Sequence, residues 1–186
     1  CLSNCRTSRG ASSISSPISC LYVFRRFKAP IGFMDVISIP KMNLNYRMLI
    51  TDKGKLTLVE IDADEASWEL CRIEDKTVIK GGKIQLNLSG GRNILLDKND
   101  YKCGDTLKVS FDGQKILDHY PLAGGSTVLI KEGSHSGDIK TVKDVEIVRG
   151  AAPNLVLFTD GTETVMRNCF VIGADSPAVK LPEASE

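Results

Sequence analysis

The residues best suited to bind another molecule lie in one short stretch, KEGSHSGDIK, at 131–140. Its side chains offer hydrogen-bond donors and a stacking ring rather than paired catalytic acids. The candidate binding side chains are Lys131, Ser134, His135 and Lys140. Gly133 and Gly137 stand at the ends of the central loop, where glycine permits a positive φ and close approach of another molecule's backbone. This combination is typical of a contact loop, in which lysine can meet phosphate and His135 can stack on a base.

Short apolar runs of β type must position this loop. One run lies at 128–130, and another at 139–142 is followed directly by 145–148. The remaining strands of this region are expected at 154–158, 162–167 and 169–173. Five short strands with tight turns in about 50 residues are typical of a small SH3-like barrel.

The chain before this region also alternates apolar and polar residues between tight turns. The expected hairpin turns are Asp52-Lys53-Gly54, Gly81-Gly82, Ser89-Gly90-Gly91 and Asp112-Gly113. Asp-Gly between alternating strands is a good hairpin signal. The segment 62–70 breaks the alternation, and Asp62 with Glu65 three residues later predicts a capping box and one short helix. We expect Trp68, within that helix, to fill the core.

The expected fold is therefore mainly β, with two small β modules. The sequence PLAGG at 121–125 predicts the joint between them. We assign 29–120 to a central β domain with one short helix and 121–174 to the SH3-like barrel. Residues 1–28 stay an unassigned tail, either a cloning-derived, misread or truncated end or a disordered arm. Residues 175–186 are expected to form a flexible tail.

Charge is distributed unevenly along a chain whose net charge is +1. Residues 1–50 hold seven basic residues and one acid, a net charge of +6, whereas the remainder has 17 basic and 22 acidic residues, a net charge of −5. A basic end on a mildly acidic body predicts one charged contact face. The basic residues expected on it are Arg25, Arg26, Lys28, Lys41 and Arg47. The alternative is an ordinary solvated tail.

Catalytic motifs are incomplete in this chain. The stretch GSHSG at 133–137 has His135 where a G-x-S-x-G hydrolase elbow needs its serine, and a strand follows instead of a helix. The stretch KGGK at 80–83 lacks the spacing and the hydroxyl residue of a phosphate-binding loop. No pair of acids lies in an apolar setting that would tune a general acid against a base. We therefore expect no enzymatic activity.

The cysteines and histidines do not predict a metal site. The six cysteines form no C-x-x-C pair, and His119 and His135 have no metal-binding partner nearby in the sequence. We expect Cys71, Cys103 and Cys169 to be small, mostly buried hydrophobic residues in a reducing compartment. No metal and no cofactor are expected.

Residues 29–49, APIGFMDVISIPKMNLNYRML, together with the G-x-x-x-G loop, resemble one known family. The stretch GFMDVI and the pair Tyr46-Arg47 are the most specific matches. On these residues the chain resembles the archaeal and eukaryotic small-subunit ribosomal protein family S4e, over residues 27–173 and with an archaeal character. The family has an N-terminal S4-type RNA-binding domain, a central β domain and a C-terminal KOW domain with an SH3-like barrel. The chain resembles the last two, and residues 1–28 do not match the first, which we expect to be absent or corrupted here.

The resemblance extends to the loop. Gly133, Gly137 and Ile139 fall on positions that match KOW modules, whose loop touches RNA or protein. Lys140 falls where many KOW motifs have a further glycine, so we expect a less tight turn and a lysine that points to phosphate. The implied function is that of a structural, non-catalytic constituent of the small ribosomal subunit that binds ribosomal RNA and supports translation.

The partners implied by this resemblance are small-subunit ribosomal RNA and neighbouring ribosomal proteins, on the cytoplasmic ribosome. We expect no membrane partner, because no apolar run is long enough to span a bilayer, and a monomer outside the ribosome. The alternative function is a KOW or SH3-like protein-binding module of the transcription-elongation type, whose loop grips another protein. Binding to ribosomal RNA fragments across a salt series separates the two.

Overall fold

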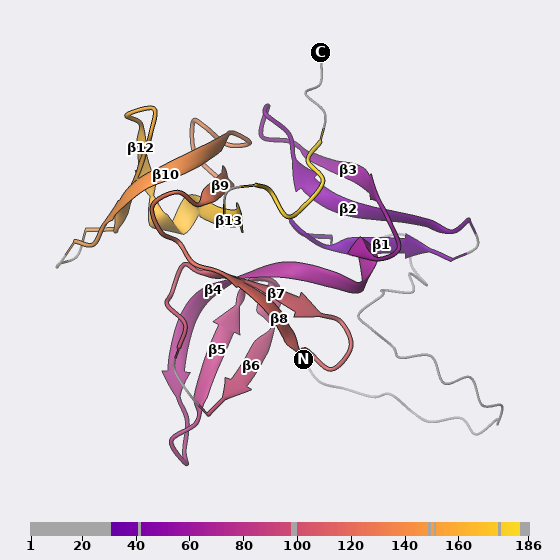
Figure 1. The fold of residues 1–186 in the computed structure, drawn as a ribbon, viewed down its shortest axis with the longest axis horizontal. Coiled ribbons are helices and arrows are strands. Elements are labelled where there is room, and N and C mark those ends of the chain that lie inside the picture. The colour runs from indigo at the N-terminus through magenta and orange to yellow at the C-terminus, as the bar shows by residue number, and fades with distance from the viewer. Residues whose placement is uncertain are drawn as a thin grey trace.

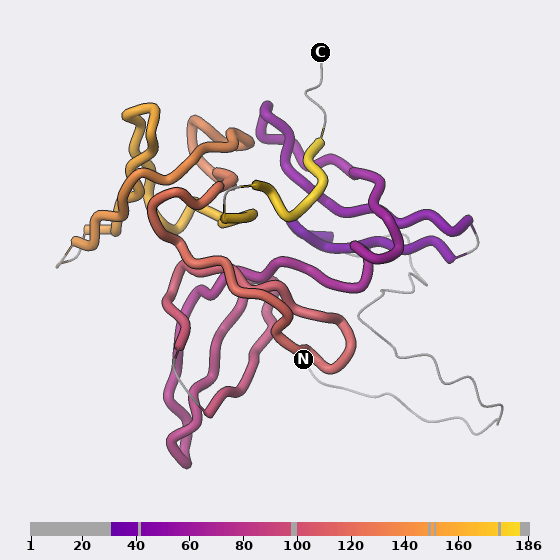
Figure 2. The backbone as a smooth tube through the Cα atoms, in the orientation of Figure 1, coloured from indigo at the N-terminus to yellow at the C-terminus, as the bar shows by residue number. Residues whose placement is uncertain are grey.

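The computed structural model describes residues 31–40, 42–97, 100–148, 150, 152–174 and 176–182. Within these residues the protein has thirteen strands in three antiparallel sheets, three short 3₁₀ turns and no α-helix. The three sheets meet at a common centre (Figures 1 and 2). The expectation of a mainly β fold is confirmed.

The first sheet has the order β1-β2-β3. Its strands are β1 (Val36–Ile39), β2 (Leu44–Ile50) and β3 (Leu56–Ile61). The turn at Asp52-Lys53-Gly54 joins β2 to β3 as predicted, with Gly54 at a φ of +72°. Successive side chains of a strand point to opposite faces, so Arg47 and Leu49 of β2 point to the same face, and both are buried.

The second sheet has the order β6-β5-β4-β7-β8. Its strands are β4 (Trp68–Val78), β5 (Ile84–Leu88), β6 (Asn93–Leu96), β7 (Thr106–Ser110) and β8 (Ile116–Tyr120). The 3₁₀ turn η2 (Ser89–Gly91) joins β5 to β6, and the turn at Gly81-Gly82 joins β4 to β5. The core of this sheet is formed by Cys71, Ile73, Leu86, Leu88, Ile94, Leu107 and Val109.

The third sheet has the order β12-β11-β10-β9-β13. Its strands are β9 (Thr127–Ile130), β10 (Ile139–Glu146), β11 (Leu155–Phe158), β12 (Glu163–Val165) and β13 (Cys169–Gly173), with η3 (Met166–Asn168) before the last. Strand β13 returns to pair with β9, so the five strands form a half-barrel around a core that includes Val128, Val142 and Phe158. This is the sheet that the SH3-like pattern predicts.

The helix predicted at 62–70 is wrong. The segment contains only the single 3₁₀ turn η1 (Glu65–Ser67), with Asp64 as its N-cap and no capping hydrogen bond from a side chain. Trp68 already has extended backbone angles and begins β4. Residues 68–73 are all buried, because β4 packs on both faces. Burial on both faces overrides the local helix signal, since propensity is a weak prior. Trp68 does fill the core, as expected.

One core cluster joins all three sheets. It combines Leu49 of β2, Leu70 of β4, Leu129 of β9 and Phe170 of β13, and it also includes Val179 beyond the last strand. The ring of Phe33 packs edge-on against Phe170, with 5.0 Å between the ring centroids. The joint predicted at 121–125 lies where the chain passes from the second sheet to the third, and this cluster packs the sheets together across it.

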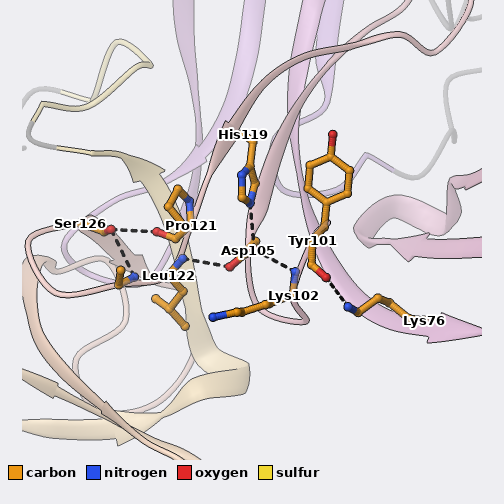
Figure 3. A network of polar contacts seen from close by, with 9 residues as sticks. Lys76, Tyr101, Lys102, Asp105, His119, Pro121, Leu122 and Ser126 are labelled. Atoms are coloured by element: carbon orange, nitrogen blue, oxygen red, sulfur yellow. Dashed lines mark hydrogen bonds and ion pairs between the residues drawn. The ribbon is translucent and has the colours of Figure 1, made fainter. Parts of the chain in front are cut away.

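A buried carboxylate fixes the start of that joint (Figure 3). Asp105, before β7, accepts hydrogen bonds from the backbone N–H groups of Lys102 and Leu122, both at 3.0 Å. Its Oδ2 also lies 2.8 Å from Nε2 of His119 on β8. On the far side of the joint, the Ser126 hydroxyl donates to the Pro121 carbonyl at 2.8 Å. The passage between the two sheets is therefore held by side chains from both ends.

Candidate nucleic-acid interface

The loop between β9 and β10 has a fixed backbone. The Gly137 N–H donates to the Ile130 carbonyl at 2.8 Å, and the Ser136 N–H donates to the Gly133 carbonyl at 3.3 Å. The Ser136 hydroxyl donates to the carbonyl of Lys131 at 2.7 Å. Gly133 has a φ of +108° and Gly137 a φ of +98°, so both glycines adopt the positive φ that their positions predict. The loop therefore presents Ser134 and His135, which are exposed, on an ordered turn.

The close approach at Gly137 is made by the protein itself. A Cβ on Gly137 would overlap the carbonyl oxygen of Thr51 and lie 2.7 Å from the Cα of Asp52. Gly54 on the same turn faces Ser136, whose Oγ would lie 3.4 Å from a Cβ on Gly54. The glycine expected to admit another molecule's backbone thus admits the turn between β2 and β3.

This packing forms a composite surface, which we call the loop–turn surface. An open groove of about 590 Å³ lies along it. The groove is lined by Asp52, Lys53, Gly54, Lys131, Glu132, Gly133, Ser134 and Ser136. Two lysines from different sheets therefore line one groove. Sequence reasoning missed Lys53, because nothing in its neighbourhood in the chain indicates that the turn meets the loop.

Lys140 does not point outward as expected. Its side chain is 11% exposed, and its Nζ donates to the Thr162 hydroxyl at 3.0 Å. The same Nζ lies 3.9 Å from Oδ2 of Asp138 and 3.8 Å from Oδ2 of Asp160. Its charge is therefore balanced by two carboxylates of its own barrel, and the expectation that it points to phosphate is corrected.

The ring of His135 contacts a carboxylate through one nitrogen and is otherwise partly exposed. Its Nδ1 lies 3.3 Å from Oδ2 of Asp138, and its side chain is 45% exposed. The ring therefore remains open on the surface while one nitrogen is oriented by a neighbour. A histidine held in this way can still stack on a base.

The prediction that Arg47 lies on a basic face is also corrected, because this residue lies in the interior. Its side chain is completely buried, and Nη2 donates to the carbonyls of Glu65 and Trp68, both at 2.8 Å. The guanidinium also lies 4.4 Å from the centre of the Trp68 ring. Burial lowers the pKa of Arg47, whereas the charges of Glu65 and Glu69 act in the opposite direction. Arg47 holds the η1 turn in place. The other basic residues predicted for that face, Arg25, Arg26, Lys28 and Lys41, lie outside the described residues.

Known proteins share this architecture. A model of the Ribosomal family S4e matches residues 42–116. The small ribosomal subunit protein eS4 of Methanocella arvoryzae is 44% identical over 161 residues, an alignment that covers 85% of this chain and 68% of that protein. The chain belongs to the S4e family.

Other members support the same relationship. The eS4 protein of Methanothermobacter thermautotrophicus is 40% identical over 162 residues, which cover 85% of this chain and 66% of that protein. The crystal structure of the 30S ribosomal protein S4e from Thermoplasma acidophilum superposes with a TM-score of 0.68 at 33% identity, covering 77% of this chain and 73% of that one. The chain thus spans about two thirds of the length of these sequence relatives. Membership in S4e favours a ribosomal protein over the transcription-elongation alternative.

Two further kinds of site are not supported within this S4e chain. No group of three or more His, Cys, Asp or Glu side chains in the described residues could hold a metal ion. None of the helices among those residues is long and apolar enough to cross a membrane. Of the three cysteines in this part of the chain, Cys71 and Cys169 are buried as expected, whereas Cys103 is exposed.

Proposed function

We propose that this chain is a structural, non-catalytic constituent of the small ribosomal subunit and that it binds ribosomal RNA through the loop–turn surface. The observation that carries this proposal is the docking of the β9–β10 loop on the β2–β3 turn, which brings Lys53 and Lys131 to one open groove. A ribosomal protein holds a folded RNA surface, and lysines that neutralise phosphates supply affinity without sequence discrimination. Membership in the S4e family supports this function.

Each residue of the loop–turn surface has a distinct expected contribution. Lys53 and Lys131 would approach phosphates, whereas Ser134 offers a hydroxyl to phosphate or a 2′-hydroxyl and His135 offers a ring to an unstacked base. Gly133 has no side chain, so RNA could approach the backbone of the loop closely at this position. Asp52 and Glu132 line the same groove, and their repulsion of phosphate restricts where along the groove RNA can lie.

The test is the affinity of the full chain for small-subunit ribosomal RNA across a salt series. Replacing Lys53 and Lys131 together by Ala should weaken binding and reduce the log–log salt slope by roughly 0.7–0.9 for each phosphate that is no longer neutralised. The matched control is Lys140→Ala, which removes a lysine of the same barrel that does not line the groove and should leave the slope unchanged. An equal reduction of affinity in both variants, or none in either, would count against the loop–turn surface as the RNA-binding surface.

We further propose that the protein contacts neighbouring ribosomal proteins in the cytoplasmic ribosome and is monomeric when free. Sedimentation equilibrium of the purified chain tests the second statement, and a mass that rises with concentration would contradict it.

A further inference from the structure

A second groove, of about 400 Å³, lies between the second and third sheets. Its walls include Arg72, Glu74 and Cys103 on one side and Asn154, Met166 and Arg167 on the other. A Cβ on Gly104 would overlap the Met166 side chain, so the 102–105 turn and η3 are in direct contact, and both residues line the groove. We call this space the intersheet groove.

Arg72 is a buried cation in this groove. Its side chain belongs to a residue only 6% exposed, and its Nη1 donates to the Arg167 carbonyl at 2.9 Å. A guanidinium carries five N–H donors, and this is the one side-chain hydrogen bond that Arg72 makes among the described residues. Its Nε is buried there without a partner. A buried, under-satisfied cation is costly unless an anion accompanies it.

Arg47, which is buried, and Arg92, which is half-buried, have other surroundings in the described part of the chain. Arg47 donates to two carbonyls and lies over Trp68, whereas Nε of Arg92 lies 2.6 Å from a carboxylate oxygen of Glu69. Arg72 forms no ion pair with the carboxylates described. Nε and Nη1 of Arg47 are also buried without a partner. Arg47 lines none of the grooves described, whereas Arg72 lines the intersheet groove, where a ligand could reach its unpartnered donor.

Arg167 adds a second positive charge to the same groove. Its side chain is exposed, and its backbone carbonyl holds the guanidinium of Arg72 in place. Two arginines on opposite walls can donate to the oxygens of a single tetrahedral anion, since guanidinium N–H groups match phosphate geometry. Glu74 opposes them, which leaves a net positive groove and disfavours a site packed with several phosphates.

We propose that the intersheet groove binds one backbone phosphate of ribosomal RNA, held between Arg72 and Arg167. The inference rests on the proposed RNA-binding function and adds a second binding site, separate from the loop–turn surface. The phosphate is favoured over a protein carboxylate because the proposed partner is RNA, whose backbone supplies phosphates at regular intervals. The bound phosphate would supply the acceptors that Arg72 lacks.

Alkylation of Cys103 can be used to detect binding in the intersheet groove, because this exposed cysteine lines the groove. The experiment measures the rate at which iodoacetamide alkylates single cysteines of the full chain, resolved by peptide mass spectrometry, with and without small-subunit ribosomal RNA. A Ser134→Cys variant places a second reporter on the loop–turn surface of the same molecule. We expect RNA to slow alkylation at both positions.

Adding Arg167→Gln should then remove the protection of Cys103 and keep the protection at position 134. This variant retains the carbonyl that holds Arg72, so folding should be preserved. It should also lower the log–log salt slope of binding by about 0.7–0.9. The matched control is Lys80→Gln, which removes an exposed charge at the β4–β5 turn, outside both grooves, and should change neither rate.

The outcomes separate the two proposals. Protection at position 134 without protection of Cys103 would overturn the intersheet site and leave the proposed function standing. Protection of Cys103 that survives Arg167→Gln would also overturn it, since shielding would then not depend on the arginine side chain. Protection at neither position, together with absent binding, would overturn the proposed function itself.

Discussion

Gly137 lies against the backbone of Thr51, so closely that a Cβ on Gly137 would overlap the Thr51 carbonyl oxygen. The two residues are far apart in the chain and lie in connections of different sheets, Thr51 between β2 and β3 and Gly137 between β9 and β10. Their packing fixes the barrel loop on the β2–β3 turn and creates the loop–turn surface. The geometry of the proposed RNA-binding surface thus depends on Gly137, because only a residue without a Cβ lets the loop pack this closely on the β2–β3 turn.

The substitution Gly137→Ala should lower the free energy of unfolding by about 2–4 kcal/mol, because it adds a backbone clash to the strain of a positive φ. The control is Gly161→Ala in the same sheet, where φ is +78° but a Cβ would meet no atom within 4 Å. Strain alone should cost about 1–2 kcal/mol there. Urea unfolding measures both, and equal destabilisation would show that the packing against Thr51 contributes nothing.

Replacing Arg47 by Leu should destabilise the fold by about 3–5 kcal/mol, because the carbonyls of Glu65 and Trp68 would be left without their donor in the interior. Urea unfolding is again the measurement. Removal of the exposed Lys80 side chain by Lys80→Ala should stay within about 0.5 kcal/mol of the unmodified protein. A variant at position 47 that keeps full stability but loses RNA affinity would restore Arg47 to the binding face.

Removing the carboxylate of Asp105 by Asp105→Ala should cost about 2–4 kcal/mol, since two backbone N–H groups and His119 lose their acceptor. Hydrogen exchange should quicken at the Leu122 amide, which donates to this carboxylate. The exposed turn residue Asp112 is the matched control, and Asp112→Ala should leave that amide unchanged. Slow exchange at Leu122 in Asp105→Ala would mean that the joint is held by other interactions.

The stability of the fold should fall in alkaline solution through Cys169. Burial raises the pKa of this thiol to about 11, from 9.0 for an ordinary thiol, with the charge of Arg72 acting in the opposite direction. The unfolded chain therefore loses this proton first, so the contribution is complete below about pH 9 and is lost as the pH rises through about 11. Melting temperatures of Cys169→Ala and the unmodified chain, compared from pH 8 to 11, should show a shallower decline in the variant. Parallel declines would contradict this role for the thiol.

The hairpins could be predicted from the sequence because their signals are local. Gly81-Gly82 and Asp112-Gly113 lie at turns whose glycines have positive φ, and alternating residues beside them pair as strands. The predicted helix at 62–70 failed for the opposite reason. Its burial comes from partners such as Phe170, about a hundred residues away, which no local pattern contains.

In the candidate site, too, the features with local signals could be predicted from the sequence, and those that depend on distant residues could not. The ordered loop with Gly133 and Gly137 follows from residue type, whereas the burial of Lys140 depends in part on residues outside the loop, Asp160 and Thr162. Lys140 is paired with Asp160, which lies between β11 and β12. No sequence pattern indicates that the side chain of Arg72 donates to the carbonyl of Arg167. The boundary at 121–125 stays a prediction.

The central cluster also sets the order in which the chain can finish folding. Leu49 and Leu70 are made early, yet the same cluster requires Phe170 and Val179. During synthesis the apolar side chains that the first two sheets contribute to this cluster therefore lack their last partners until almost all of the described chain has been made. Nascent chains with such unpartnered apolar side chains are prone to aggregate, so a growing chain of this protein is expected to need a chaperone, or an RNA surface that covers it, before its last strand arrives.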